Sequence, residues 1–387
     1  MTPIEKPRAD WRTLAILHPA FALTGVLQAM SGALLPALAP AFHLSDSDSG
    51  LLFLLYFAGT STGPFFFRRR YVRTTALGFV LMALCCVALA FANRPLLAPL
   101  FLLLGVSVGI PMSGASLYVG RVFAERCAPM LSFLNLTWSA GALAAPLLAA
   151  RVLEQHSYRA VYLVLACMAA VAAAACALGL REASEAARTK DASCVATSVK
   201  LIALFALVAF LQVGVENTAS AWLATYTQRT SAAGIALAAA SSALYWAGFL
   251  ASRGVASFLL LRVAAARVLR ISVALALAAA VLLAVVPTPG MRGAAMILLG
   301  IALAPIYPLV IAGFFARARR TLDSRWVLTS AGCGGAVMPW MAGWISAHVG
   351  NLRLGILVLP MALLVMAGLL PLLNAPAAAP GGAAVQG

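Results

Sequence analysis

Long uncharged apolar blocks alternate with short polar connections along almost the whole chain. Each block has roughly the 20 apolar residues that a helix needs to cross the hydrocarbon core of a bilayer. The pattern therefore predicts an all-α membrane protein with twelve transmembrane helices. The predicted spans are 13–38, 49–67, 74–92, 95–119, 129–150, 160–180, 200–224, 233–256, 268–287, 291–316, 326–347 and 352–374.

These spans divide the chain into two bundles of six helices, 13–180 and 200–374. The most polar stretch of the chain, 181–199, connects the two bundles and is predicted to be a cytoplasmic loop. Residues 1–12 form a polar N-terminal segment. The tail 375–387 is rich in Ala, Pro and Gly and is expected to be disordered, because such a composition has little to pack.

Composition excludes a soluble globular protein. Hydrophobic residues make up 63% of the 387 residues and charged residues only 10%, against about 25% in an ordinary soluble domain. The net charge of +16 would favour nucleic acid as a partner in a soluble protein. Here the basic residues lie between the spans, so the expected surroundings are a lipid bilayer and no nucleic acid is expected.

Lysine and arginine positions predict the orientation of the spans, because cytoplasmic connections carry an excess of both. With both termini and the central loop in the cytoplasm, the cytoplasmic segments hold 21 of the 27 basic residues and the outer connections hold six. Arg253 is counted here with the cytoplasmic connection that follows the eighth span. The distribution favours a multi-pass protein of the cytoplasmic (inner) membrane with both termini inside.

The two predicted bundles also resemble one another in sequence. Residues 55–59 (LYFAG) match 244–248 (LYWAG), and the pair 104–105 (LG) matches 299–300 (LG). A Gly that precedes a Pro by five residues occurs in both the fifth and the eleventh span. Three matches in one register indicate duplicated halves, which is a transporter architecture with the binding site between the halves.

Residues 12–374 resemble the major facilitator superfamily of transporters. The chain shares twelve spans, a basic polar central loop and arginines after spans two and eight with that family. The segment 59–73 (GTSTGPFFFRRRYVR) keeps the glycines and arginines of the family's usual loop and lacks its Asp, whereas 248–262 (GFLASRGVASFLLLR) follows the pattern more closely.

Within the superfamily, the seventh span is similar to that of fucose–proton symporter-like sugar carriers. The similarity lies in 210–216 (FLQVGVE), 222–226 (WLATY), 305–308 (PIYP) and 334–340 (GGAVMPW). One departure is that spans one and four contain no acid here, whereas fucose–proton symporters carry acids there. The resemblance implies a monomeric, proton-coupled carrier of a sugar or polyol.

Glu216 is the acidic residue that the sequence singles out. The other ten acids are predicted to lie in loops or at span ends, and Glu216 lies in the middle of the seventh span. An acid at the bilayer centre costs ~3 kcal/mol on insertion scales, so such residues usually face a cavity and act there. We expect Glu216 to couple protons or bind the substrate; the alternative is a structural acid bonded to a neighbouring helix.

Further candidates for substrate binding are polar and aromatic residues inside the spans. Gln212 lies four residues before Glu216 and shares its helical face, whereas Asn217 is turned about 100° away. The other candidates are Gln28, Asn135, Trp138, Tyr245, Trp246, Tyr307 and Trp340. The amides have an alternative role in bonding helices together, and the aromatic rings an alternative role in packing.

The sequence lacks the motifs of other membrane-protein classes. It contains no nucleotide-binding GxxxxGK[ST], no HExxH and no GxSxG, and its seven cysteines show no paired spacing. We therefore expect that the protein is not an enzyme and that it binds neither a metal nor a cofactor.

The expected function is secondary active transport of a small polar solute, a sugar or polyol, by alternating access and with proton coupling. The alternative is a proton-antiport efflux carrier for amphipathic drugs or metabolites. The remaining hypotheses are a membrane enzyme and a sensor that does not transport its ligand.

Overall fold

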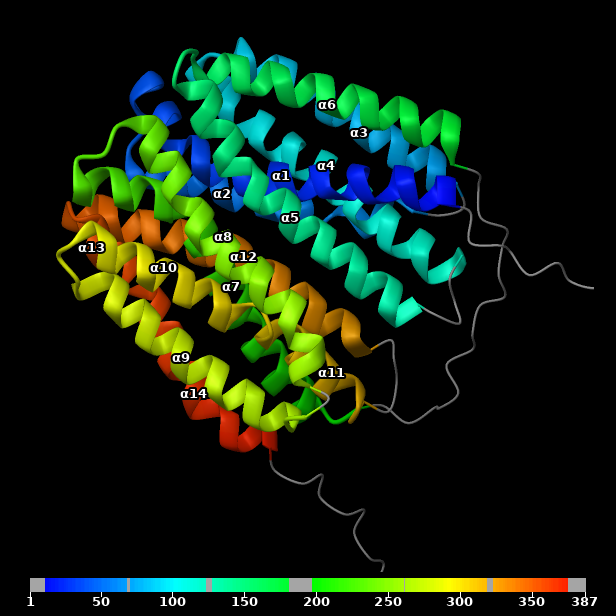
Figure 1. Cartoon of the computed structure of the whole chain (residues 1–387), viewed down its shortest axis with the longest axis vertical. Helices are drawn as coiled ribbons and strands as arrows, with labels where there is room; N and C mark the ends of the chain where they lie inside the picture. The colour runs from blue at the N-terminus through cyan, green and yellow to red at the C-terminus, as the bar shows by residue number, and fades with distance from the viewer. Residues whose placement is uncertain are drawn as a thin grey trace, which may run out of the picture.

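A computed structural model describes most of the chain as helices joined by short turns (Figure 1). The described residues are 11–67, 70–122, 127–180, 197–260, 262–318 and 323–374. The predicted N-terminal segment 1–12, the central loop 181–199 and the tail 375–387 lie largely or wholly outside these ranges. No strand occurs among the described residues.

The first half of the chain forms helices α1 to α6. Their bounds are α1 Trp11–Ala41, α2 Asp46–Thr60, a short 3-10 helix η1 Gly63–Phe66, α3 Tyr71–Ala90, α4 Arg94–Val122, α5 Cys127–Leu153 and α6 Tyr158–Gly179.

The second half forms helices α7 to α14. Their bounds are α7 Val199–Ser231, α8 Ile235–Leu259, α9 Ala265–Val285, α10 Pro289–Leu303, α11 Ile306–Phe315, α12 Ser324–Val349, α13 Leu352–Ile356 and α14 Val358–Asn374.

The observed helices follow the predicted spans, and two spans are interrupted. The predicted span 291–316 is split into α10 and α11, and 352–374 is split into α13 and α14. Among the described residues, ten stretches are long and apolar enough to cross a membrane, each of the two split spans supplying one of them. Helices α2 and α12, which correspond to the predicted second and eleventh spans, are not among those ten.

The prediction for the second span was wrong at its end. The predicted span 49–67 runs seven residues beyond the end of α2 at Thr60, and η1 follows. Pro64 has no backbone N–H to donate to the carbonyl of Thr60 and disfavours helical geometry at the residue before it, which favours an end of the α-helix at Thr60.

Among the described residues, the main contacts between the two halves are those of the helix pairs α1–α7, α1–α8, α2–α12 and α5–α8. Glycine makes the first of these approaches possible, because a Cβ atom at Gly32 of α1 would overlap the carbonyl oxygen of Ser220 on α7. We call the end of the molecule where α1 and α7 finish the outer end, following the orientation expected from the charges.

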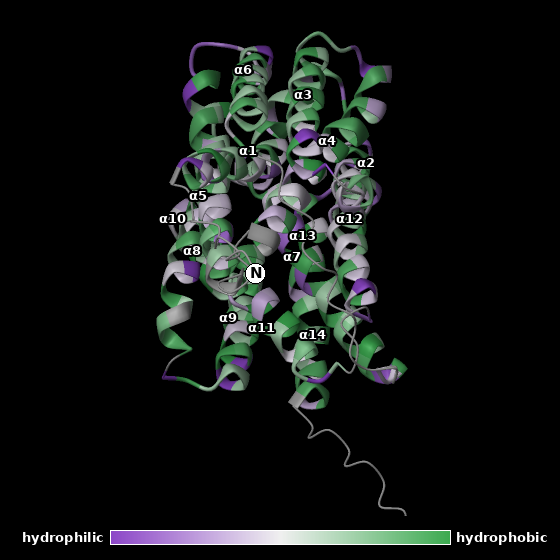
Figure 2. Cartoon of the chain, turned by 90° about the vertical axis from the view of Figure 1, so that its right-hand side faces the viewer, coloured by the Kyte–Doolittle hydropathy of each residue, from purple (hydrophilic) through white to green (hydrophobic). Residues whose placement is uncertain are grey.

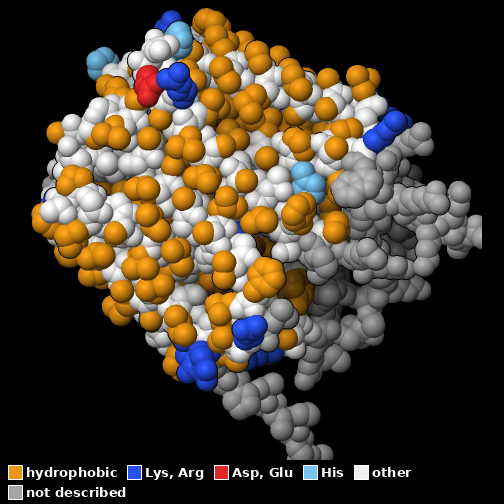
Figure 3. Space-filling model, viewed as in Figure 1, with side chains coloured by type: hydrophobic (Ala, Val, Ile, Leu, Met, Phe, Trp, Pro, Cys, Tyr) orange, Lys and Arg blue, Asp and Glu red, His pale blue; other side chains and the backbone are white. Residues whose placement is uncertain are grey.

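The sides of the molecule are apolar. Hydrophobic residues dominate the length of the helices (Figure 2), and a few charged side chains interrupt the hydrophobic face shown in Figure 3. Large exposed side chains include Leu77, Leu84, Val171, Leu178 and Leu364. An apolar surface this extensive fits a lipid environment.

Candidate functional site

Glu216 lies on α7 with its side chain partly exposed. Its carboxyl group forms no hydrogen bond and no ion pair with another described residue. Three groups interact with it electrostatically: Arg253 and Tyr245 on α8, and Tyr307 on α11. We call these four residues the central cluster.

The charge count places Arg253 in the connection after the eighth span, but in the structure this residue lies inside α8, six residues before the end of the helix at Leu259. Its Nη1 donates hydrogen bonds to Ser139 Oγ at 2.9 Å and to the carbonyl oxygen of Asn135 at 3.2 Å. Both acceptors belong to α5, so Arg253 joins the two halves of the molecule. Its guanidinium carbon also lies 4.6 Å from the centre of the Phe249 ring.

The guanidinium of Arg253 lies at a depth similar to that of Glu216. Ser139 precedes the outer end of α5 at Leu153 by 14 residues, and Glu216 precedes the outer end of α7 at Ser231 by 15 residues. At 1.5 Å per residue both positions are roughly 21–23 Å below the outer end. The two opposite charges therefore lie at one level, near the middle of the helices.

Aromatic side chains cross the interface beside Arg253. The rings of Trp138 on α5 and Trp246 on α8 meet edge to face at 5.6 Å, and Tyr245 packs on Trp246 at 5.0 Å. Arg253 lies 5.6 Å from the Trp138 ring centre. The indole N–H of Trp138 and the hydroxyl of Tyr245 are buried and have no partner among the described residues.

The two amides near Glu216 bond to neighbouring helices. Gln212 is fully buried and donates to the carbonyl oxygen of Leu303 at 3.1 Å, at the end of α10. Asn217 donates to the carbonyl oxygen of Gly335 on α12 at 3.2 Å. In this structure both side chains connect helices within the second half, the alternative role that amides often take in membranes.

The remaining candidates are spread over the interface. Gln28 is buried on α1, and its Oε1 has no partner among the described residues. Tyr307 is half-buried on α11, and the side chain of Asn135 is exposed. Trp340 is half-buried on α12, where its backbone lies against Gly50 of α2.

A charged contact links the two halves at the outer end, and no sequence pattern singled out its residues. Asp46 at the start of α2 binds Arg229 of α7 through two hydrogen bonds, of 2.7 and 2.6 Å. Ser346 of α12 donates a hydrogen bond to the same carboxylate. We call Asp46, Arg229 and Ser346 the outer contact.

Electrostatics favour the ionised form of Asp46. Burial of its carboxyl group opposes ionisation, but the hydrogen bonds from Arg229 and Ser346 and the charge of Arg229 outweigh burial. The pKa of Asp46 is therefore lowered from its ordinary value of 3.8. The outer contact is an ionic link between the halves at neutral pH.

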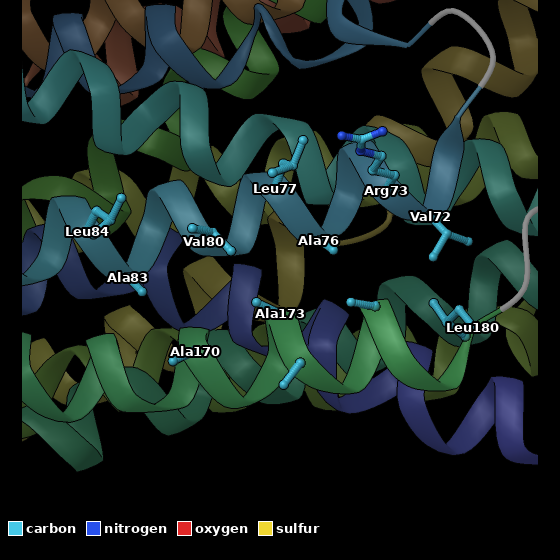
Figure 4. Close-up of a pocket in the computed structure, with 12 residues that line it drawn as sticks. Val72, Arg73, Ala76, Leu77, Val80, Ala83, Leu84, Ala170, Ala173 and Leu180 are labelled. Carbon is cyan, nitrogen blue, oxygen red and sulfur yellow. The ribbon is translucent and has the colours of Figure 1, made fainter.

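One cavity lies away from all these residues. It occupies about 650 Å³ between α3 and α6 and is lined mostly by Ala, Val and Leu, with Arg73 at one end (Figure 4). None of the candidate residues lines it. Its apolar lining suits lipid acyl chains better than a polar solute. Among the described residues, no cluster of His, Cys, Asp and Glu could hold a metal ion.

The fold and the charged interface define a helical membrane transporter built from two halves. The model of the Major Facilitator Superfamily matches residues 17–322, and the chain belongs to this family. A comparison with curated protein sequences gives no match.

Solved structures of three transporters share the fold. A bacterial homologue of the human lysosomal transporter Spinster, inward-facing and unoccupied, has a TM-score of 0.76 at 15% identity, over 94% of this chain and 97% of that one. A D-xylose–proton symporter has a TM-score of 0.72 at 13% identity, over 92% and 97%. The transporter FucP in its outward conformation has a TM-score of 0.62 at 18% identity, over 94% and 98%.

Proposed function

We propose that this transporter moves a small polar solute, a sugar or polyol, by alternating access and that Glu216 couples the movement to protons. The observation that carries the proposal is the unpaired carboxyl group of Glu216 in the middle of α7. An acid in a membrane helix is costly unless it has a function or a partner, and here it has no hydrogen-bonded partner among the described residues. It can therefore take up and release a proton without breaking a structural bond.

The surroundings of Glu216 suit a hydroxylated ligand. Tyr245 and Tyr307 place phenols near the carboxyl group, and Trp138 and Trp246 supply aromatic faces at the same interface. Aromatic rings with a polar tip bind molecules that are apolar on one face and polar at the edge. The fold is also shared with a D-xylose–proton symporter, which supports the proposal.

Alternating access requires contacts between the halves that can break. We propose that the bundles 13–180 and 200–374 rock as bodies in the cytoplasmic membrane, in a monomer with both termini inside. The outer contact and the approach of Gly32 to Ser220 would then belong to the state that is closed outward. Opening outward would separate these residues.

The test is uptake into proteoliposomes with an imposed pH gradient. We expect Glu216→Gln to abolish accumulation of the sugar driven by the gradient while leaving exchange of substrate across the membrane. Glu154→Gln is the matched control, since that acid is exposed and pairs with Arg151 at the outer end of α5. Unchanged gradient-driven accumulation in Glu216→Gln would contradict the assignment.

The second candidate, efflux of amphipathic compounds, is favoured by the aromatic rings at the interface. Positive charge on Arg253, at the same depth as Glu216, opposes a cationic ligand. Export of lipophilic cations that depends on Glu216 would favour this second function over solute uptake.

A further inference from the structure

Within the described part of the chain, the guanidinium of Arg253 is hydrogen-bonded by neutral partners alone. Its hydrogen bonds go to a hydroxyl and a backbone carbonyl of α5, and its guanidinium carbon lies over the Trp138 and Phe249 rings. A guanidinium has five N–H donors. The Nε of Arg253 is buried with no partner among the described residues, so part of this binding capacity is unused.

The positive charge is also incompletely neutralised. Glu216 interacts with Arg253 electrostatically, but no ion pair joins these two residues in the described part of the chain. A charge inside a membrane protein is normally paired. The group that fits a guanidinium best is a carboxylate, which accepts two parallel N–H hydrogen bonds.

We propose that the transported solute is a small hydroxylated carboxylate, such as a sugar acid, whose carboxylate binds Arg253 while Glu216 carries a proton. This inference rests on the proposed function, because it takes the same site and the same proton-coupling residue and replaces a neutral sugar or polyol with its acid.

Charge balance explains how proton and solute move together. The titratable groups that interact with Glu216 among the described residues are Arg253, Tyr245 and Tyr307, and the two phenols carry no charge at neutral pH. The empty site, with Arg253 positive and Glu216 negative, is neutral. The loaded site, with Glu216 protonated and the carboxylate bound to Arg253, is neutral as well.

The partly loaded states are charged. The anion without the proton leaves one net negative charge in the interface, and the proton without the anion leaves one net positive charge. Moving either state through the closed interface requires an unpaired charge away from water, which is unfavourable. The expected stoichiometry is one proton with one monocarboxylate, so that transport carries no net charge.

The experiment measures uptake and binding of D-gluconate, with D-glucose and D-glucitol as neutral probes, in proteoliposomes of the full chain at pH 5.5 and 8. We expect gluconate uptake that responds to a pH gradient and not to a potential set with potassium and valinomycin. Arg253→Gln should weaken gluconate uptake about tenfold or more, because a neutral amide replaces a charged bidentate partner. Arg262→Gln, an exposed arginine beyond the end of α8, is the matched control and should leave uptake unchanged.

The pH dependence of gluconate binding in Glu216→Gln tests proton coupling, because a purely structural role of Glu216 would not change this dependence. Glutamine resembles the protonated acid, so this variant should bind gluconate equally at both pH values. Wild-type affinity should fall by up to tenfold per pH unit once Glu216 ionises. Arg253→Lys keeps the charge and should retain more gluconate binding than Arg253→Gln. It also provides a second test of the inference if Arg253→Gln does not fold.

The outcomes separate the two proposals. Uptake of glucose or glucitol that depends on Glu216 and is unchanged in Arg253→Gln overturns the carboxylate inference and leaves the proposed function standing. Gluconate uptake that depends on Arg253 but ignores pH and Glu216 supports anion binding and removes proton coupling. If none of the probes is transported or bound, the carboxylate inference is overturned.

Discussion

The outer contact offers a sharp test of how the two halves move. Asp46→Asn removes the charge that Arg229 binds and keeps the size of the side chain. Because the Asp46 carboxylate joins α2 to both α7 and α12, its loss should weaken the state in which the outer end is closed. The expected effect is a shift of the conformational equilibrium toward the outward-open state.

The size of the shift follows from burial and geometry. The Asp46 side chain is 11% exposed, while Arg229 is 43% exposed. Exposed ion pairs contribute about 0.2–1 kcal/mol and hydrogen bonds to charged groups about 1.5–3 kcal/mol. Discounting for the exposure of Arg229 gives about 1–2 kcal/mol, which corresponds to a shift of about 5- to 30-fold in the equilibrium.

The assay is labelling of a cysteine introduced at Ser220, in a variant whose seven native cysteines are replaced. Ser220 is buried on α7 under Gly32 of α1, so an impermeant maleimide reaches it from outside when the halves separate at the outer end. The labelling rate of the Ser220→Cys protein should rise by about the same 5- to 30-fold when Asp46→Asn is added.

Asp48→Asn is the matched control. Asp48 lies two residues further along α2 and pairs with Arg94 of α4, within the same half. Its substitution should leave the labelling rate unchanged. The exchange of both charges, Asp46→Arg with Arg229→Asp, should restore slow labelling in part. Equal labelling of Asp46→Asn, Asp48→Asn and the parent protein would refute the role of the outer contact.

Three further predictions follow from residues near the outer end. Because the pKa of Asp46 is lowered in the closed state, the outer contact stabilises that state fully above the ordinary pKa of 3.8 and is lost as pH falls through the lowered value. The labelling rate of Ser220→Cys should therefore rise only at such acidic pH. Asp46→Asn should remove this pH dependence. Gly32→Ala should speed the same labelling, because the added methyl group overlaps the Ser220 carbonyl and pushes α1 away from α7. Labelling as slow as in the parent protein would show that the two helices accommodate the methyl group without separating. Trp222→Phe should lower the free energy of unfolding by ~1–3 kcal/mol, because the indole N–H donates to the buried carbonyl of Pro339; an unchanged thermal midpoint in detergent would contradict this.

Hydrophobic patterning predicted most of the fold because membrane spans must satisfy every backbone group within the helix. Long apolar blocks therefore become long helices even where prolines interrupt them, as at Pro19 and Pro36 inside α1. The pattern failed where local backbone chemistry decides the outcome. Hydropathy does not predict that the α-helix ends before Pro64, or that α10 and α11 are separate helices with Pro305 between them.

The role of Arg253 could not be predicted from charge counting. A basic residue near the end of a span is normally a topology determinant, and its partners on α5 lie more than a hundred residues away in sequence. One signal was present: Tyr245, Phe249 and Arg253 recur every four residues and so share one face of α8. Since Tyr245 was a candidate already, the same face pointed to Arg253.

Helical spacing alone also could not separate Gln212 from Glu216. The two residues share one face of α7, and both are polar groups in an apolar helix. The structure distinguishes them through their partners: Gln212 donates to a carbonyl that the end of α10 leaves free, whereas Glu216 has no hydrogen bond to another described residue. A helix–helix bond makes a polar group part of the scaffold. A charged group without such a bond, opposite an arginine whose donors are partly unused, has the chemistry to bind and release a proton and a solute.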